Sequence, residues 1–262
     1  MAEETTQGPK GKFVWYEYMG DDLAGAEDFY AEVVGWKIKD AGMGDFAYRI
    51  GSVGEYGVVG LMNIPAEAKA MGTPACWTGY IWVPDVDAAC VQLAADGGQV
   101  MRPASDIPGV GRFAVVADPQ GAVFMLFRDA GGNPPPPPAP NTAGLVGWHE
   151  LHANDGVAAL KFYSDTFGWK KDSEFDMGPM GAYHLFSTGH GEFGGIFTKR
   201  PEMPGPFWLY YFNVEAIDAG VARLTAKGGK VVNGPMEVPG GQWVVQAVDQ
   251  QGGYFALVAP KR

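Results

Sequence analysis

The sequence predicts an α+β protein built from four βαβββ modules, and three observations support this. The chain has 262 residues, enough for two domains of about 130 residues each. Its second half repeats its first half. Each half shows, twice over, a strand followed by one helix and further strands. One helix per module, with the rest in strands, is typical of a fold whose helices cover one face of a sheet.

The internal repeat is visible in two blocks that align without a gap. Residues 15–37 match residues 148–170 with nine identities in 23 positions. Residues 77–127 match residues 208–258 with seventeen identities in 51 positions. Repeats at one fixed period indicate a duplicated structural unit. The alignment therefore predicts two similar domains, residues 12–130 and 144–260.

A Gly/Pro-rich segment, residues 131–143, separates the two halves. It contains five consecutive prolines, Pro134 to Pro138. Such a run favours polyproline II and acts as a stiff spacer. We interpret it as a linker rather than as an SH3-type ligand, because it joins two homologous halves.

In the first module each element has a local signal. Residues 13–19 alternate and are rich in Val, Trp and Tyr, which predicts a strand. Asp22 is placed to cap a helix whose apolar residues recur at helical spacing, and Gly35 ends it. Strands are expected near residues 46–50 and 57–62.

The second module repeats this order from Trp77. It begins with a strand over residues 79–83 and continues with a helix from Asp87 to about Ala95. Asp118-Pro119-Gln120-Gly121 has the residues of a turn between strands. Three further strands are expected, near residues 99–102, 112–117 and 122–127.

Composition and charge exclude several classes of partner. The net charge of −11 repels phosphate groups and argues against nucleic acid and anionic membranes. No apolar run approaches the length that spans a bilayer, and because the N-terminus is polar we expect no secretory signal. Cys76 and Cys90 are too few for a disulfide framework. We expect a cytoplasmic protein, a monomer or homodimer, whose partner is a small molecule.

Two sets of motifs, each present in both halves, resemble the vicinal oxygen chelate superfamily. This superfamily includes glyoxalase I, bleomycin resistance proteins and extradiol dioxygenases, and the tandem two-domain glyoxalase-like proteins look most similar. The resemblance implies that paired βαβββ modules form two glyoxalase-like barrels in tandem, each around a cavity. The motifs are Phe29-Tyr30 with Gly35-Trp36, Phe162-Tyr163 with Gly168-Trp169, and Asp118-Pro119-Gln120-Gly121 with Asp249 and Gly252.

Metal-binding members of this superfamily take a His from the first strand, a His or Glu from the second module's first strand, and a Glu from its last strand. Divalent ions need such nitrogen and oxygen ligands. The resemblance therefore implies that the usual metal site is lost in both halves, and no cofactor is expected. The corresponding positions are Trp15, Thr78 and Met125 in the first half and Trp148, Leu209 and Ala256 in the second.

Glu17 and Glu150 are the candidate catalytic residues. Residues two apart on a strand share a face, so Glu17 lies with Trp15, and Glu150 lies with Trp148 and His152. Each glutamate is a candidate acid or base, or a hydrogen-bond acceptor for a ligand. Two alternatives remain: a rebuilt metal site in which His184 joins Glu150 and His152, and a purely structural glutamate.

Two functions are compatible with these residues. The first is a metal-free protein that binds a flat or cationic organic molecule in an aromatic cavity. The second is a glyoxalase-like lyase or isomerase that acts on a small carbonyl compound through Glu17 or Glu150. The sequence does not determine whether modules pair within each half or the first with the fourth. The expected ligand-binding residues are Trp15, Arg49, Thr78, Met125, Trp148, His152 and His184.

Overall fold

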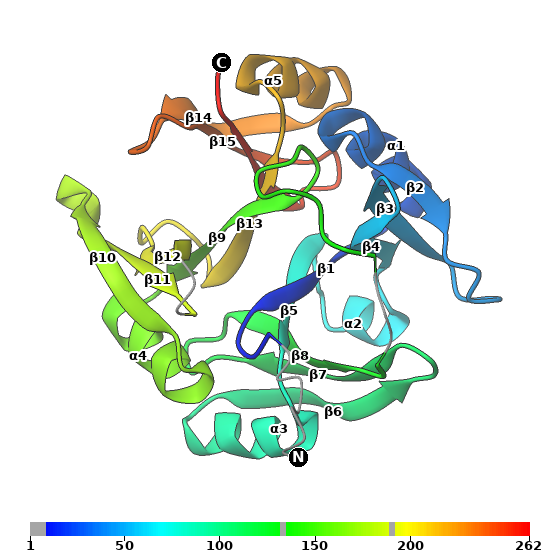
Figure 1. Cartoon of the computed structure of the whole chain (residues 1–262), viewed down its shortest axis with the longest axis vertical. Helices are drawn as coiled ribbons and strands as arrows, with labels where there is room; N and C mark the ends of the chain where they lie inside the picture. The colour runs from blue at the N-terminus through cyan, green and yellow to red at the C-terminus, as the bar shows by residue number, and fades with distance from the viewer. Residues whose placement is uncertain (1–8, 132–134, 189–191) are drawn as a thin grey trace, which may run out of the picture. The chain divides into compact units, whose positions relative to one another are not determined.

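The computed structural model describes residues 9–131, 135–188 and 192–262, and it confirms the α+β class (Figure 1). The βαβββ order occurs four times. The first half contains β1 (Phe13–Gly20), α1 (Leu23–Val34), β2 (Lys37–Asp40), β3 (Tyr48–Val53), β4 (Tyr56–Asn63), the short α2 (Ala66–Ala70), β5 (Cys76–Trp82), α3 (Val86–Ala95), β6 (Gln99–Ile107), β7 (Gly111–Ala117) and β8 (Val123–Asp129).

The second half repeats these elements. It contains β9 (Val146–Ala153), α4 (Gly156–Phe167), β10 (Lys170–Asp176), a single 3₁₀ turn η1 (Gly178–Met180), β11 (Ala182–Ser187), β12 (Glu192–Thr198), β13 (Phe207–Asn213), α5 (Ile217–Ala226), β14 (Lys230–Glu237), β15 (Trp243–Val248) and β16 (Tyr254–Ala259). The linker expected at residues 131–143 has no helix or strand in its described part, and residues 132–134 lie outside the described residues.

The strands form two eight-stranded sheets, one from each repeat. The strand order is β2-β3-β4-β1-β5-β8-β7-β6 in the first and β10-β11-β12-β9-β13-β16-β15-β14 in the second. Within the modules β1 runs parallel to β4, β5 to β8 and β13 to β16. The outer strands pair antiparallel, as in β2 with β3, β3 with β4, β6 with β7 and β7 with β8, and likewise in β10 with β11, β11 with β12, β14 with β15 and β15 with β16.

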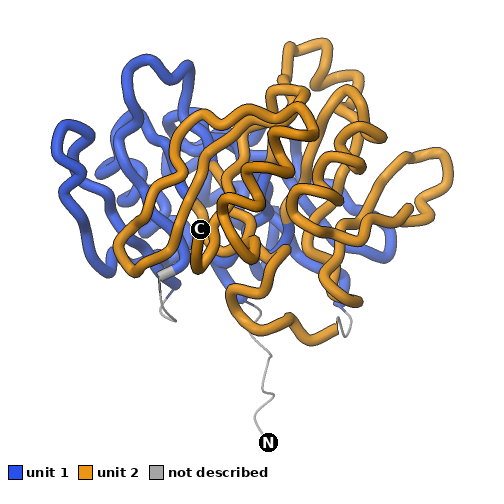
Figure 2. Tube along the Cα trace, turned by 90° about the horizontal axis from the view of Figure 1, so that it is seen from above, with its two compact units in different colours: residues 1–15, 78–133, 150–208 blue, residues 16–77, 134–149, 209–262 orange. Residues whose placement is uncertain are grey.

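The compact units of the chain combine modules from both repeats (Figure 2). Unit 1 comprises residues 1–15, 78–133 and 150–208, and therefore holds the second and third modules. Unit 2 comprises residues 16–77, 134–149 and 209–262, and holds the first and fourth. The structure thus answers the question of pairing that the sequence left open. The domain boundaries at residues 12–130 and 144–260 stay a prediction.

Unit 2 contains a buried chain of hydrogen bonds that joins its two modules. The indole nitrogen of Trp77 donates to the hydroxyl of Tyr30 at 2.8 Å. Tyr30 on α1 in turn donates to a carboxylate oxygen of Asp249 at 2.8 Å. The other oxygen of Asp249 accepts from the backbone of Gln251 and Gly253. The Phe-Tyr motif of one repeat is therefore bonded to the turn motif of the other.

Unit 1 repeats this arrangement. Trp208 donates to the hydroxyl of Tyr163 at 3.0 Å, and Tyr163 donates to Asp118 at 3.3 Å. Asp118 also accepts from the backbone of Gln120 and Ala122, which confirms the turn expected here between β7 and β8. Burial raises the pKa of the Asp118 carboxyl, and these hydrogen bonds partly oppose that effect.

The glutamine of each turn binds the residue that caps a helix. Gln251 accepts from the backbone nitrogen of Asp22 at 2.7 Å and donates to its carbonyl at 2.9 Å. Gln120 makes the same two contacts with Asp155, both at 2.8 Å. Asp22 caps α1 through the backbone nitrogen of Gly25, as the sequence predicted.

The start of α3 differs from the prediction. The helix begins at Val86, and Asp85 rather than Asp87 marks its start, because Asp85 accepts from the backbone nitrogen of Ala88 at 3.0 Å. The carboxylate of Asp87 instead binds Arg112.

No helix in the described part of the chain is long and apolar enough to cross a membrane.

We expect Tyr30→Phe to lower the free energy of unfolding by about 1–3 kcal/mol. The substitution leaves the Asp249 oxygen and the Trp77 indole without their shared hydroxyl, and such buried groups are costly to leave unpaired. Chemical denaturation measures the change, with Tyr254→Phe at a side chain 38 % exposed as the control. Equal effects of the two substitutions would contradict this role of Tyr30.

Candidate functional site

The two candidate glutamates are buried, and each receives a tyrosine hydroxyl. Glu17 on β1 is 7 % exposed and Glu150 on β9 is 6 % exposed. Tyr48 on β3 donates to Glu17 at 3.0 Å, and Tyr183 on β11 donates to Glu150 at 2.9 Å. The duplication has therefore placed the same tyrosine–glutamate pair in unit 2 and in unit 1.

A glycine on the intervening strand makes room for each tyrosine. Gly60 on β4 lies opposite Glu17 in the β1–β4 register, and a Cβ atom at residue 60 would overlap the hydroxyl of Tyr48. Gly195 on β12 has the same relation to the ring of Tyr183. In each half the ring can reach the glutamate because this position has no side chain.

His152 makes the site in unit 1 different from its counterpart. Its Nε2 lies 2.8 Å from a carboxylate oxygen of Glu150, and the imidazole is 7 % exposed. The ring stacks on Phe207 with centroids 4.5 Å apart and meets the edge of Phe197 at 4.6 Å. The corresponding residue on β1 is Met19. Glu150 therefore belongs to a buried Tyr183–Glu150–His152 cluster, whereas no histidine stands at the matching position beside Glu17.

Arg49 and His184 do not reach the glutamates. Each directly follows the tyrosine that does, and neighbouring residues of a strand point to opposite faces. Arg49 pairs with Glu27 of α1 at 3.1 Å and also with Asp40. The Nδ1 atom of His184 lies 3.2 Å from Glu174, its partner in the β10–β11 register.

Sequence reasoning missed Tyr48 and Tyr183. The sequence favours Arg49 and His184, because these are polar residues in otherwise apolar strands. The signal that could identify them is the alternation of side chains along a strand. Once the starts of β3 and β11 are known, alternation places Tyr48 and Tyr183 on the face of the sheet that carries the glutamates.

Two of the three positions in the first half at which the resemblance implies metal ligands carry apolar side chains that pack into one cluster. In unit 1, Trp15 packs against a buried cluster that contains Met125 with Tyr80 and Phe113. Thr78 is buried two residues before Tyr80 on β5. An indole, a thioether and one hydroxyl do not fit a divalent ion.

The second half is similar in this respect. Leu209 and Ala256 are buried in unit 2, and Trp148 is half-buried on β9. None of these three side chains is an ordinary ligand for a divalent ion. Among the residues that the structure describes, no group of three or more His, Cys, Asp or Glu side chains is placed to hold a metal.

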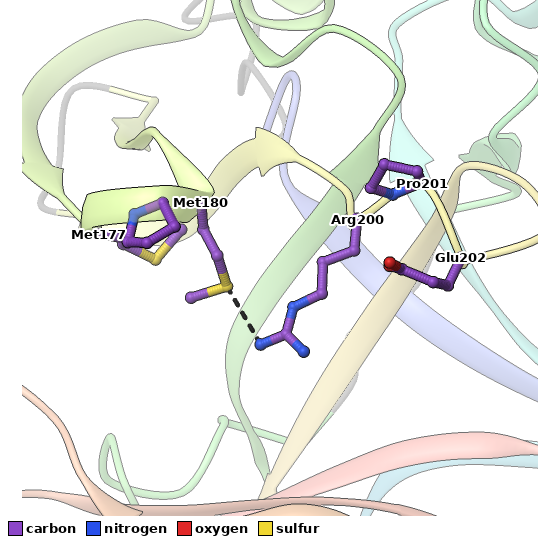
Figure 3. Close-up of a pocket in the computed structure, with 6 residues that line it drawn as sticks. Met177, Met180, Arg200, Pro201 and Glu202 are labelled. Carbon is purple, nitrogen blue, oxygen red and sulfur yellow. Dashed lines mark hydrogen bonds between the residues drawn. The ribbon is translucent and has the colours of Figure 1, made fainter.

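An open, largely solvent-exposed cavity of about 380 Å³ lies in unit 1 next to the strands of the Glu150 cluster (Figure 3). It lies between the segment that leads into β11 and the segment that leaves β12. Tyr183 on β11 and Phe197 on β12 are partners in the β11–β12 register. Met180 lies three residues before Tyr183, and Arg200 lies three residues after Phe197. The aromatic cavity that the sequence predicts around Glu17 and Glu150 stays a prediction. The walls of the cavity of unit 1 are not aromatic. They are formed by Met177, Pro179, Met180, Arg200, Pro201 and Glu202.

We expect Gly195→Ala to lower the free energy of unfolding by about 1–3 kcal/mol, the usual cost of overpacking. The added methyl group would displace the Tyr183 ring and break its hydrogen bond to Glu150. Thermal unfolding measures the effect. Gly205→Ala is the control, because a Cβ atom there meets nothing within 4 Å. Unchanged stability of Gly195→Ala would show that Tyr183 does not need this space.

Comparison with known proteins agrees with this architecture. The family model described as "Glyoxalase/Bleomycin resistance protein/Dioxygenase superfamily" matches residues 12–126 and 146–256. The Mycobacterium bovis protein named "Putative glyoxylase CFP32" is 32 % identical over 254 residues, 94 % of each chain. The Streptomyces sp. "Anthracycline biosynthesis protein DauV" is 30 % identical over 271 residues, 97 % of this chain and 94 % of the relative.

Solved structures show the same fold. The Mn(II)-bound glyoxalase of Novosphingobium aromaticivorans superposes with a TM-score of 0.67 at 18 % identity, over 96 % of this chain and 82 % of that one. The Pseudomonas sp. 2,3-dioxygenase LapB gives a TM-score of 0.66 at 15 % identity, over 95 % and 93 %. Both repeats match the family model, and the relatives match over nearly their full length. The chain therefore belongs to the glyoxalase/bleomycin resistance protein/dioxygenase superfamily.

Proposed function

We propose that this protein binds a small, flat organic molecule at the Glu150 cluster of unit 1. The observation that carries the proposal is the buried carboxylate of Glu150, held by Tyr183 at 2.9 Å and by His152 at 2.8 Å. Burying a charged group is costly unless it is paired and hydrogen-bonded. These two contacts hold the carboxylate in a fixed orientation, so it is a preorganised acceptor for a ligand hydroxyl.

The aromatic rings around the cluster favour a flat ligand. The rings of Phe197 and Phe207 contact His152, and aromatic side chains recognise planar molecules by stacking and edge contacts. Two Streptomyces relatives at 30 % identity are named anthracycline biosynthesis proteins. Anthracyclines are planar polycyclic compounds, which supports an aromatic ligand with hydroxyl groups.

Acid–base chemistry on a carbonyl compound is the second candidate. A general base needs a partner that orients it, and the contact between Glu150 and His152 has that form. Glu17 has a tyrosine but no histidine at the matching position, so the candidate base is Glu150. The relative named "Putative glyoxylase CFP32" supports this reading. Proton exchange at the carbon next to a ligand carbonyl, followed by NMR in D₂O, distinguishes catalysis from binding.

We further propose that binding needs no divalent metal at the superfamily position. Trp15 and Met125 pack into an apolar cluster there, and Leu209 and Ala256 are buried in the other half. We expect metal analysis by mass spectrometry, on protein purified without chelators, to find well below one equivalent per half. One equivalent of manganese, iron, nickel or zinc that EDTA removes together with ligand binding would contradict this.

We expect Glu150→Gln to weaken the binding of 2-naphthol, a flat hydroxyl donor, by about tenfold, because a neutral amide is a weaker acceptor than a carboxylate. Glutamine keeps the size of the side chain and can still accept from Tyr183, so the melting temperature should change little. Isothermal titration calorimetry and thermal unfolding measure the two effects. The control is Glu17→Gln in unit 2.

The opposite pattern would reject this proposal. If Glu150→Gln lowers the melting temperature by many degrees and leaves the affinity for 2-naphthol unchanged, Glu150 is a structural residue. Equal losses of affinity in Glu150→Gln and Glu17→Gln would show that the cluster of unit 1 is not the preferred site.

A further inference from the structure

Arg200 lines the cavity of unit 1 without a carboxylate partner among the described residues. Its guanidinium lies 3.4 Å from the thioether sulfur of Met180, a weak acceptor (Figure 3). Glu202 lines the same cavity, yet no ion pair joins it to Arg200 within the described part of the chain. The chain carries 30 acidic residues against 19 Lys and Arg, so carboxylates are abundant.

Four other arginines use this abundance, whereas Arg223 donates to the carbonyl of Val33 and Arg102 lies over the ring of Phe113. Arg112 pairs with Asp87 and Asp106, and Arg49 with Glu27 and Asp40. Ion pairs are also made by Arg128 with Asp129 and by Arg262 with Asp218. Arg200 instead points its guanidinium toward the sulfur of Met180 in a cavity wall. A guanidinium in this setting is well suited to receive a carboxylate from outside the chain, because its fork of N–H donors matches the two oxygens.

The remaining walls of the cavity are largely apolar. Met177, Pro179, Met180 and Pro201 surround Arg200 and Glu202. Methionine sulfur is polarisable and adapts to the shape of an aromatic body. A volume of about 380 Å³ lies within the range of small-molecule sites, which is about 300–1,000 Å³. One cation among apolar walls fits an organic anion better than an inorganic one.

The backbone places this cavity within reach of the Glu150 cluster. The backbone nitrogen of Lys199 donates to the carbonyl of Ala153 at 2.7 Å, so the segment that carries Arg200 lies beside the end of β9. Glu150 lies three residues before Ala153, a separation of about 10 Å along a strand. A bicyclic aromatic molecule with polar groups at opposite ends has about these dimensions.

We propose that the cavity binds the carboxylate of an aromatic acid, with Arg200 as its anchor and the apolar body lying on Met177 and Met180. The inference rests on the proposed function for the other end of the ligand, where a hydroxyl donates to Glu150. The ligand class is therefore a flat hydroxy-aromatic carboxylate. Glu202 disfavours a second anionic group in the same cavity by like-charge repulsion.

Calorimetry on the full chain with three probes tests this proposal. The probes are 6-hydroxy-2-naphthoate, 2-naphthol and 2-naphthoate, which carry both polar groups, the hydroxyl alone and the carboxylate alone. Arg200→Met removes the charge and keeps an extended side chain. Arg128→Met is the matched control, an exposed arginine of unit 1 that does not line the cavity. Circular dichroism verifies that both variants are folded.

We expect the native chain to bind 6-hydroxy-2-naphthoate at least about tenfold more tightly than 2-naphthol, the usual scale of a charge-assisted contact. Arg200→Met should abolish this difference and leave the affinity for 2-naphthol unchanged, whereas Arg128→Met should preserve it. Equal affinities of the two probes for the native chain, no binding of either carboxylate probe, or an unchanged preference in Arg200→Met would overturn the proposal.

Glu150→Gln separates this proposal from the proposed function. If Arg200 is required for the carboxylate probes but Glu150→Gln has no effect on any probe, the cavity site stands and the function assigned to Glu150 fails. If 2-naphthol depends on Glu150 while the carboxylate adds no affinity, the function stands and the role of Arg200 is rejected.

Discussion

The structure depends on a buried hydrogen-bond chain of tryptophan, tyrosine and aspartate. In unit 2 it runs from Trp77 through Tyr30 to Asp249, and in unit 1 the equivalent residues of the other modules repeat it. A buried carboxylate is costly, and here the tyrosine hydroxyl and two backbone N–H groups of the turn offset that cost. Burial also raises the pKa of Tyr30 well above its usual value, so the hydroxyl keeps its proton and stays a donor. Since the tyrosine and the aspartate come from different repeats, each repeat needs the other to satisfy its own buried groups.

The duplication also places one glutamate in each unit in similar surroundings, but one neighbouring residue differs between the two. Both accept from a tyrosine that passes over a glycine of the neighbouring strand. His152 adds a second, ionisable partner to Glu150, while Met19 holds the equivalent position beside Glu17. A fold of this kind fixes the backbone positions around a site, and the side chains at those positions determine the chemistry. The superfamily scaffold is thus kept in both halves, with the more elaborate polar cluster in unit 1.

The positions at which the family resemblance implies metal ligands contribute to the apolar core of unit 1. Trp15 packs against a cluster that contains Met125, Tyr80 and Phe113, so these side chains meet as apolar surfaces. Hydrophobic contacts of this kind contribute to stability in proportion to the apolar area that they bury. The polar groups proposed to bind a ligand lie outside this cluster: Glu150 with His152 and Tyr183 on the strands, and Arg200 in the cavity of unit 1.

The sequence by itself determined the four modules, the caps Asp22 and Gly35 of the first helix and the turn at Asp118, because periodicity, capping and turn residues are local signals. The resemblance of its motifs to a known superfamily was also readable and is confirmed. The loss of ordinary ligands at the metal positions stays a prediction. The tertiary structure alone decided that the first module pairs with the fourth, since the bond between Tyr30 and Asp249 joins residues 219 positions apart and leaves no local trace. It also decided that Tyr183, and not His184, meets Glu150. The physical reason is that a shift of one residue in a strand moves every side chain to the opposite face, and only the packed sheet fixes that phase.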